Sequence, residues 1–273
     1  IPTAPGQHVK TNRIDSQKIE ESLRGGQLKS IHVPTTSYRD LRHLIQLRDT
    51  CVRQATAAKC RIKALLLFEG IPFPRAGGAE GQWSKAVVAG LKTLGCAGAV
   101  RFKLDQLIDT LEFSHKQVLA TSKEIQRFCT QDAEIYRNLL LLTTIPGIGR
   151  ITGTHLLARI GDWRKMGNVR QLGAYLGLTQ RENSTGLDVN RGSITRTGDS
   201  RCRNKLIQCA WMAIRKDSEL DEFYRRIYQR HPKPIGPKKA IVAVARKMTM
   251  RIHAVLRQQR PYEVHAISSV PLT

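Results

Sequence analysis

Residues 104–139, the segment that says most about the fold, read LDQLIDTLEFSHKQVLATSKEIQRFCTQDAEIYRNL. Apolar side chains recur there at alternating steps of three and four, and eight of the eleven positions on this seam are apolar. The eleven positions are Leu104, Leu107, Leu111, Ser114, Val118, Thr121, Ile125, Phe128, Asp132, Ile135 and Leu139. A seam kept for about five heptads predicts a coiled-coil helix on the order of 60 Å long. Such a rod spaces two active parts or joins two subunits, and the alternative is a long core helix of a bundle.

Further helical patterns precede the seam. Residues 36–69 keep one face apolar and the other rich in Arg and Lys, which predicts an amphipathic helix. Residues 70–98 contain two prolines and many glycines, so we expect a loop with one short helix there. Near the start of the chain, residues 14–23 have helical spacing that ends at Gly25-Gly26.

After Leu139 the pattern changes to short helices separated by glycine turns. Residues 167–178 predict one more short helix, and residues 179–200 are polar and punctuated by glycine, which predicts a loop. Residues 200–259 predict a basic helical region.

The chain is strongly basic. Its 273 residues carry 45 Lys and Arg against 22 Asp and Glu, a formal net charge of +23. This excess argues against an ordinary metabolic enzyme and favours a polyanionic partner, of which nucleic acid is the first candidate. Residues 181–260 alone carry 19 Lys and Arg against 7 Asp and Glu, so we expect a phosphate-binding face there in preference to a merely solvated one. The residues expected to bind nucleic acid in this region are Arg191, Arg196, Arg201, Arg203 and Lys205.

Two compositional features bear on the compartment. No apolar run approaches the ~20 residues needed to cross a bilayer, so no membrane is expected as a partner. None of the six cysteines forms a CxxC pair, and we expect reduced thiols in a cytoplasmic, nucleoid-associated protein.

Pro146-Gly147-Ile148-Gly149 separates two helical runs. Glycines there allow a tight turn and expose N–H groups at the N-terminus of the helix that starts near Ile151, where a phosphate binds well. The turn resembles the helix-hairpin-helix motif of DNA-binding proteins, and we expect Gly147, Gly149 and Arg150 to contact a DNA backbone. The alternative is a plain turn between packed helices.

Two short motifs carry candidate chemistry. Ser184-Thr185-Gly186 is a turn on composition alone, because no nearby His supplies a base to activate a hydroxyl group. Asn12 and Asp15 project from one face of a helix, where one acid and one amide form at most a weak Mg²⁺ site. Without a family, this second motif is a helix start with a surface Asp.

Five motifs in order resemble those of the insertion-sequence transposases of the "one hundred and ten" family, and the resemblance covers essentially the full chain. The motifs are KTNRID at 10–15, PGIG at 146–149, YLGLT at 175–179 leading into STG at 184–186, GSITRTGD at 192–199 and KAIVAVARK at 239–247.

The resemblance implies a DNA transposase, a site-specific recombinase guided by a bridge RNA. In that family a RuvC-like domain binds Mg²⁺ through four acidic residues, and a coiled coil and a transposase domain with a helix-hairpin-helix follow. A serine just before a glycine attacks a DNA phosphate, activated by the metal site of another subunit. Carried over to this chain, Ser184 or Thr185 acts with Asp15 in catalysis, and Asn12 and Asp15 hold Mg²⁺. DNA, a guide RNA and a homo-oligomer, dimer or tetramer, joined through the coiled coil are the implied partners.

The sequence departs from the family pattern at three places. The family's first Asp and its Glu lie on strands upstream of the KTNRID motif, where only nine residues stand here. Asn12 occupies the position of the third acid, and Asp15 that of the fourth. Thr185, not Ser, precedes the glycine, and of the two hydroxyls we prefer Ser184. We therefore expect an N-terminally truncated recombinase that is inactive alone; the alternatives are a non-catalytic nucleic-acid-binding remnant and a scaffold held by the coiled coil.

The predicted fold is mainly α and has four parts. Residues 1–35 are expected to form the C-terminal edge of a RuvC-like α/β domain, and residues 36–140 long coiled-coil helices. Residues 141–262 are expected to form an all-α transposase domain with the helix-hairpin-helix, and residues 263–273 a disordered tail.

Overall fold

A computed structural model describes residues 11–28, 33–74, 83–96, 98–185 and 188–263. The chain forms two compact units, Ile1–Thr35 and Thr36–Thr273, which are described separately. The described residues are mainly helical, as the sequence predicts, with one short β-hairpin. The predicted tail from residue 264 onward lies outside the described residues. None of the helices described here is long and apolar enough to span a membrane.

The first unit contains helix α1 (Asn12–Arg24). The helix starts there because the Thr11 side chain accepts a hydrogen bond from the Ile14 N–H, at 3.3 Å, in the N-cap position. It ends at Gly25, followed by Gly26 with a left-handed backbone, so the predicted glycine stop is confirmed.

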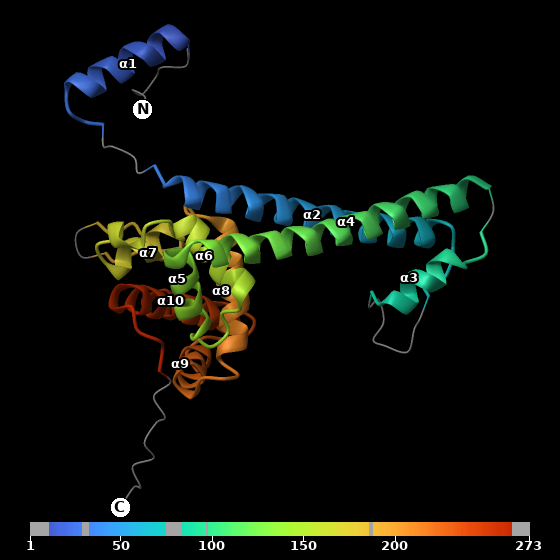
Figure 1. The fold of residues 1–273 in the computed structure, drawn as a ribbon. Coiled ribbons are helices and arrows are strands. Elements are labelled where there is room, and N and C mark those ends of the chain that lie inside the picture. Colours follow the sequence, from blue (N-terminus) through green and yellow to red (C-terminus); the bar gives the residue numbers. More distant parts are fainter. Residues whose placement is uncertain (1–10, 29–32, 75–82, 97, 186–187, 264–273) are drawn as a thin grey trace, which may run out of the picture. The chain divides into compact units, whose positions relative to one another are not determined.

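The second unit contains an arm made of two long antiparallel helices, α2 (Thr36–Phe68) and α4 (Gly98–Gln131), which lie side by side in Figure 1. The predicted helix over 36–69 is thus confirmed. The start of α2 packs against the end of α4, and the end of α2 packs against the start of α4. At the far end of the arm, the short helix α3 (Lys85–Lys92) buries Val87 and Leu91 against the same apolar cluster. This is the short helix expected within residues 70–98.

The long seam does not form one continuous helix. Helix α4 ends at Gln131, and α5 (Ala133–Thr143) begins directly after Asp132. The Asp132 carboxylate accepts the N–H groups of Glu134 and Ile135, both at 3.0 Å, and so caps a new helix where the seam predicted a continuous rod. The prediction of an unbroken helix to Leu139 is therefore wrong. The buried positions of the seam before Asp132 pack against α2 of the same chain.

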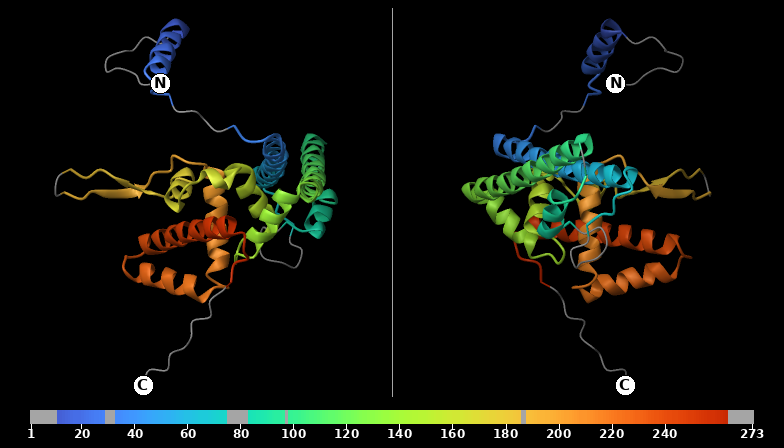
Figure 2. Two further views of the ribbon diagram at one scale, coloured as in Figure 1. Left: turned by 60° about the vertical axis from the view of Figure 1, so that its left-hand side comes forward. Right: turned by 90° about the vertical axis from the view of Figure 1, so that its right-hand side faces the viewer.

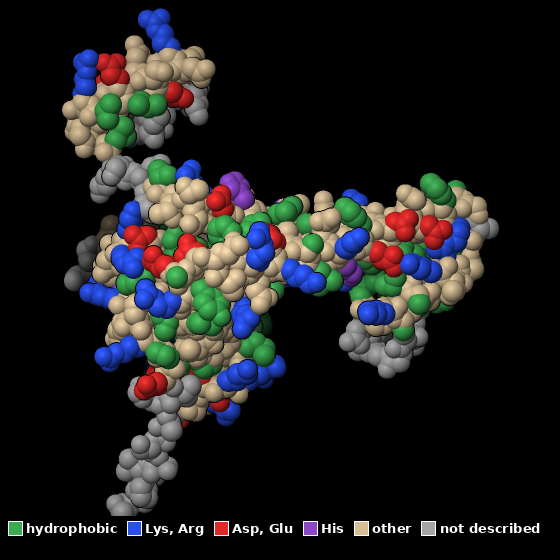
Figure 3. Space-filling view, viewed as in Figure 1, with side chains coloured by type: hydrophobic (Ala, Val, Ile, Leu, Met, Phe, Trp, Pro, Cys, Tyr) green, Lys and Arg blue, Asp and Glu red, His purple; other side chains and the backbone are tan. Residues whose placement is uncertain are grey.

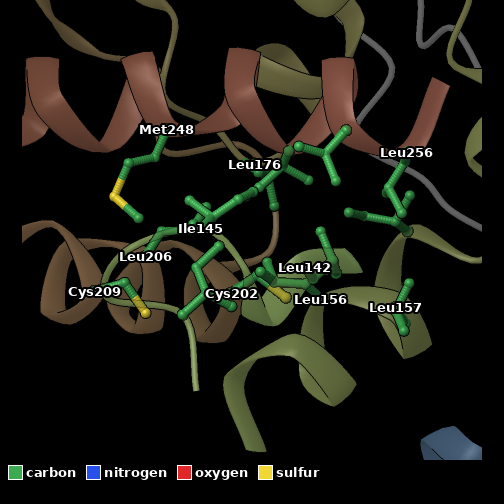
Figure 4. Packing of buried hydrophobic residues seen from close by; sticks show 14 of the residues in the cluster. Leu142, Ile145, Leu156, Leu157, Leu176, Cys202, Leu206, Cys209, Met248 and Leu256 are labelled. Carbon is green, nitrogen blue, oxygen red and sulfur yellow. The ribbon is translucent and has the colours of Figure 1, made fainter. Parts of the chain in front are cut away.

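The remaining helices form a compact body beside the arm (Figure 1). They are α5, α6 (Arg150–Ile160), a 3-10 turn η1 (Trp163–Lys165), α7 (Val169–Tyr175), α8 (Ser200–Ala213), α9 (Ser218–Gln229) and α10 (Ile235–Gln258). Figure 4 shows the body core, in which α10 covers apolar residues and cysteines from α5, α6 and α8 and from the turns that follow α5 and α7. The root of the arm shares this core through Leu41 and Ile45, so arm and body are packed together at that point.

The body is not purely helical, which corrects the prediction of an all-α domain and of a loop over residues 179–200. Strands β1 (Gln180–Glu182) and β2 (Arg191–Ile194) pair antiparallel and project from the body (Figure 2, left). Every residue of the two strands is exposed except Ile194, which is partly buried. The strands lack the apolar alternation that marks a half-buried sheet, and backbone pairing forms the hairpin instead.

Candidate functional site

The projecting hairpin carries the predicted nucleophiles. Gln180 pairs with Ile194 and Glu182 with Arg191, so β2 has one extra residue between these pairs, a β-bulge. The pairing continues toward the tip, where the Asn183 N–H donates to the Asn190 carbonyl at 2.9 Å. Thr185 and Asp188 form the last bridge that the structure describes.

Ser184 and Thr185 lie beside this tip and are both exposed. The Ser184 hydroxyl donates to Oε1 of Glu182 at 3.2 Å and accepts the N–H of Asn190, also at 3.2 Å. Thr185 exchanges backbone hydrogen bonds with Asp188, at 3.2 and 3.1 Å. The hydrogen bond to Glu182 thus gives the Ser184 hydroxyl a carboxylate partner.

Glu182 is the residue of this group that the sequence reasoning missed. It is the last residue of β1, two positions before Ser184, and its carboxylate accepts the hydrogen bond of the Ser184 hydroxyl. Because residues 179–200 were predicted to be a loop, the two-residue spacing between Glu182 and Ser184 did not indicate a contact between their side chains. A search for acceptors at i−2 and i+2 of the serine, with a hairpin assumed, would have found this carboxylate.

A close backbone contact fixes the base of the hairpin on the body. Gly177 has a left-handed backbone, with φ of +66°, and a Cβ atom on Gly198 would clash with the Tyr175 carbonyl and lie 2.6 Å from the Gly177 nitrogen. The Thr195 N–H donates to the Thr179 carbonyl at 2.8 Å. Two strands and a helix end therefore meet with no room for side chains, which accounts for glycine at both positions.

Arg203 also helps to hold the base of the hairpin on the body. It is buried, and its guanidinium Nη1 donates to the Leu176 carbonyl at 3.1 Å. The sequence grouped Arg203 with the nucleic-acid-binding arginines. In the structure its guanidinium points into the body and binds the turn that precedes the hairpin. Asp199 lies at the same place: it is the N-cap of α8, and its Oδ2 is 3.0 Å from Nε of Arg159.

The other predicted basic residues have different settings. Arg191 is exposed on β2, with its Nε 3.8 Å from Oε2 of Glu182. Arg196 is exposed in a left-handed conformation, with φ of +57°. Arg201 lies 3.9 Å from the Asp49 carboxylate, and Lys205 is partly buried. On the face drawn in Figure 3, Lys and Arg side chains lie at several separate places rather than in one patch.

The two glycines in the turn between α5 and α6 have different roles. Gly147 has φ of +87°, and a Cβ there would clash with the Cys209 carbonyl of α8, so this glycine serves packing. Gly149 caps α6 without a side-chain hydrogen bond, and a Cβ there would meet no atom within 4 Å. Arg150 follows it and is exposed. The open end of α6 therefore presents N–H groups and a cation to solvent, as an anion site requires.

A buried polar pair connects α6 to the arm. His155 Nε2 lies 3.1 Å from Oδ1 of Asp49 on α2. Burial lowers the pKa of His155, and the hydrogen bond to Asp49 opposes this effect only in part. Burial acts to raise the pKa of Asp49, but the His155 hydrogen bond and the charges of Lys205 and Arg201 outweigh it, so the pKa lies below its usual value.

In the first unit, Asn12 and Asp15 both stand in the first turn of α1. Asn12 is exposed and Asp15 partly exposed, and the Ser16 hydroxyl donates to the Asn12 carbonyl at 2.8 Å. Within the described ranges, no three His, Cys, Asp or Glu side chains are grouped so that they could hold a metal ion. A single carboxylate with an amide does not supply the oxygen set that Mg²⁺ requires, so these residues do not form a magnesium site on their own.

Comparison with known proteins identifies the class of protein. A model of the Transposase IS116/IS110/IS902 family matches residues 139–225, and a model of the DEDD transposase domain of IS110 type matches residues 3–69. Both matches are to transposases. The chain belongs to the IS116/IS110/IS902 family of transposases.

Individual relatives agree with this. The chain is 26% identical to the transposase for insertion sequence element IS1111A of Coxiella burnetii, over 94% of this chain and 69% of the relative. It is 29% identical to the transposase for IS1328 of Yersinia enterocolitica, over 74% of this chain and 59% of the relative. It is 33% identical to the pilin gene-inverting protein of Moraxella bovis, over 48% of this chain and 40% of the relative. It is 28% identical to a putative transposase of Sinorhizobium fredii over 77% of this chain and 50% of the relative, so the chain spans only part of the length of its relatives.

Proposed function

We propose that the chain is the part of a DNA transposase that cuts and rejoins DNA through the Ser184 hydroxyl. The position of Ser184 carries this proposal: the hydroxyl is exposed on a hairpin that projects from the body and is hydrogen-bonded to a carboxylate. A hydroxyl needs such a partner to act as a nucleophile. This carboxylate partner favours Ser184 over Thr185 as the nucleophile. A covalent serine–DNA link would preserve the phosphodiester energy until a second DNA end attacks it.

Nucleic-acid binding is assigned to the exposed cations around the hairpin and α6. Arg191 is the first residue of β2, Arg196 follows that strand, and Arg150 stands at the open end of α6. Arg201 and Lys205 follow on α8. These side chains suit phosphate groups, and contacts to phosphate position a nucleic acid without reading its sequence, which fits a protein whose target is specified by other means. Arg203 and Gly147 are left out of this surface because both are used in packing.

The family resemblance adds partners to this proposal. We expect a guide RNA that specifies the DNA, and a homo-oligomer that holds two DNA duplexes. The net charge of +23 suits either nucleic acid. The resemblance also adds Mg²⁺, with Asp15 as one ligand and Asn12 beside it. Because these two residues do not form a magnesium site on their own, no step of the proposed reaction is derived through a metal ion.

The proposal is tested by trapping the covalent intermediate. The chain would be incubated with labelled DNA from its own genomic locus, RNA transcribed from that locus and Mg²⁺, and then denatured in SDS. We expect label on the protein band, lost in Ser184→Ala and kept in Thr185→Ala. Loss in Thr185→Ala alone would move the nucleophile to Thr185. Unlabelled protein under all conditions would reject the enzymatic proposal for this chain.

Asn12 favours a second candidate function, that of a non-catalytic nucleic-acid-binding protein. An amide stands where the family resemblance calls for an acid, which removes one charge from the metal site. This candidate predicts binding that weakens steeply with salt and an absence of covalent adduct. The adduct experiment and a salt titration of binding separate the two functions.

A further inference from the structure

Three polar side chains meet beside the tip of the hairpin. Glu182 is the last residue of β1, and Arg191 is paired with it across the hairpin, so the two share one face of the sheet. Ser184 follows two positions later, beyond the strand, and its hydroxyl contacts the Glu182 carboxylate. The arrangement comes from the backbone register, because the strands bury almost no side chain.

The contacts beside the tip are those that a reactive hydroxyl requires. The Ser184 hydroxyl donates to Oε1 of Glu182, and the 3.2 Å between the two oxygen atoms is within the range expected for a general base. The N–H of Asn190 donates to the Ser184 oxygen at 3.2 Å, where it would stabilise negative charge that develops on that atom. The Arg191 guanidinium lies 3.8 Å from Oε2 of Glu182, so a positive charge stands beside the carboxylate.

We propose that Glu182 is the catalytic general base that activates Ser184 for attack on phosphorus, with Arg191 offsetting its charge as a DNA phosphate approaches. The inference rests on the proposed function of Ser184 as the nucleophile. It supplies the base that was missing from the sequence, where no His stands near the Ser-Thr-Gly motif.

The step balances in atoms and charge. The Ser184 Oγ–P bond forms while a P–O bond to a deoxyribose oxygen breaks, and the hydroxyl proton passes to the Glu182 carboxylate. The leaving oxygen takes a proton from solvent, and Glu182 releases its proton to solvent. The reverse transfers regenerate the serine when a DNA hydroxyl attacks the phosphoserine linkage.

The test uses two readouts on the same variants. The first is the rate of DNA adduct formation at neutral pH. The second is covalent labelling of Ser184 by a fluorophosphonate, followed by mass spectrometry of the hairpin peptide. In the second reaction fluoride leaves phosphorus and Glu182 takes the serine proton, so neither DNA nor RNA is needed. The variants are Glu182→Gln and Glu182→Asp, with Glu222→Gln on the exposed surface of α9 as the matched control.

We expect Glu182→Gln to slow both reactions about 100-fold, at the low end of general-base effects. Glu182→Asp should keep a carboxylate and react at an intermediate rate, and Glu222→Gln should behave as the wild type. Equal labelling rates in wild type, Glu182→Gln and Glu222→Gln would overturn the inference. If no DNA adduct forms but labelling depends on Glu182, the proposed function fails while the activation of Ser184 stands.

Discussion

Arg251 on α10 donates to the Asp217 carboxylate at 2.6 Å, in an ion pair whose side chains are 9% and 1% exposed. Asp217 also caps α9 by accepting the Leu220 N–H at 3.1 Å, and it accepts the Tyr262 hydroxyl at the same distance. Glu219 binds the other side of the Arg251 guanidinium at 2.7 Å. The pair therefore joins α9, α10 and the end of the described chain in one network.

Removal of the cation alone should destabilise the body strongly. In Arg251→Met the Asp217 carboxylate stays buried without its partner, which typically costs about 3–5 kcal/mol of unfolding free energy. Urea denaturation followed by circular dichroism would measure this loss. The control is Arg225→Met, which breaks the exposed pair with Asp221 and should change the stability by about 0.5 kcal/mol or less. Similar stabilities for the two variants would contradict the buried role of Arg251.

The same network predicts an acid dependence. Burial alone would raise the pKa of Asp217, but the hydrogen bonds from Arg251, the Leu220 N–H and Tyr262 lower it below the ordinary value of 3.8. A lowered pKa stabilises the fold above that value, and the stabilisation is lost as the pH falls through the folded-state pKa. The stability gap between wild type and Asp217→Asn should thus be full at pH 6 and shrink below about pH 4. A gap independent of pH would show that the Asp217 charge is not involved.

His155 predicts a pH effect nearer to neutrality. Its pKa is lowered from 6.5, chiefly by burial, with Asp49 and Arg48 facing it from α2 and Lys205 and Arg201 near it on α8. A neutral buried His stabilises the fold above its unfolded pKa, and this contribution is lost as the pH falls below about 6.5. The melting temperature of the wild type should therefore fall more between pH 7 and 5 than that of His155→Gln. Parallel pH profiles of the two proteins would refute this role of His155.

The two glycines of the α5–α6 turn should respond differently to alanine. Gly147→Ala meets both a positive φ and the α8 backbone, so we expect a loss of about 2 kcal/mol or more in unfolding free energy. Gly149→Ala meets open space and should fold as the wild type does, which makes it the matched control. Thermal unfolding of both proteins would check this, and equal melting temperatures would show that Gly147 is not packed on α8.

The nucleic-acid surface predicts a division among the arginines. Arg150→Ala and Arg191→Ala should each weaken binding and reduce the salt slope of log K by about one, because each removes a phosphate contact. Arg203→Ala should instead lower the melting temperature, since its guanidinium holds the Leu176 carbonyl. Fluorescence anisotropy across a salt series, together with thermal unfolding, separates the two effects. A salt slope reduced by Arg203→Ala in a fully folded protein would place Arg203 on the binding surface.

Helix positions were predictable where local signals and burial agreed. The helix that starts near Thr36 and the glycine stop after α1 follow from periodicity and from the positions of the glycines, whereas the short helix α3 was expected within residues 70–98 without bounds. The break at Asp132 was predictable in principle, because an Asp followed by Glu134 is a capping signal. The apolar seam outweighed it in the sequence, since Ile135 and Leu139 keep the same period on both sides of the break.

The candidate site was less accessible from sequence. Arg203 and Arg201 have the same chemistry two positions apart, and only the packing of α8 shows that one faces the core and the other solvent. The hairpin was missed because its residues are polar on both faces, so its pairing leaves no periodic apolar trace. The contact between Glu182 and Ser184 depends on that pairing and became visible only with it.

The hairpin stands on a fixed base yet buries almost nothing along its strands. Folding therefore places few demands on the identity of its side chains beyond the glycines at its foot. These residues can be substituted without loss of folding, whereas residues of the body core cannot. Any strand residue held constant while its neighbours drift would then have been kept by selection for the reaction, so natural variation in this short element becomes a direct record of what the chemistry needs.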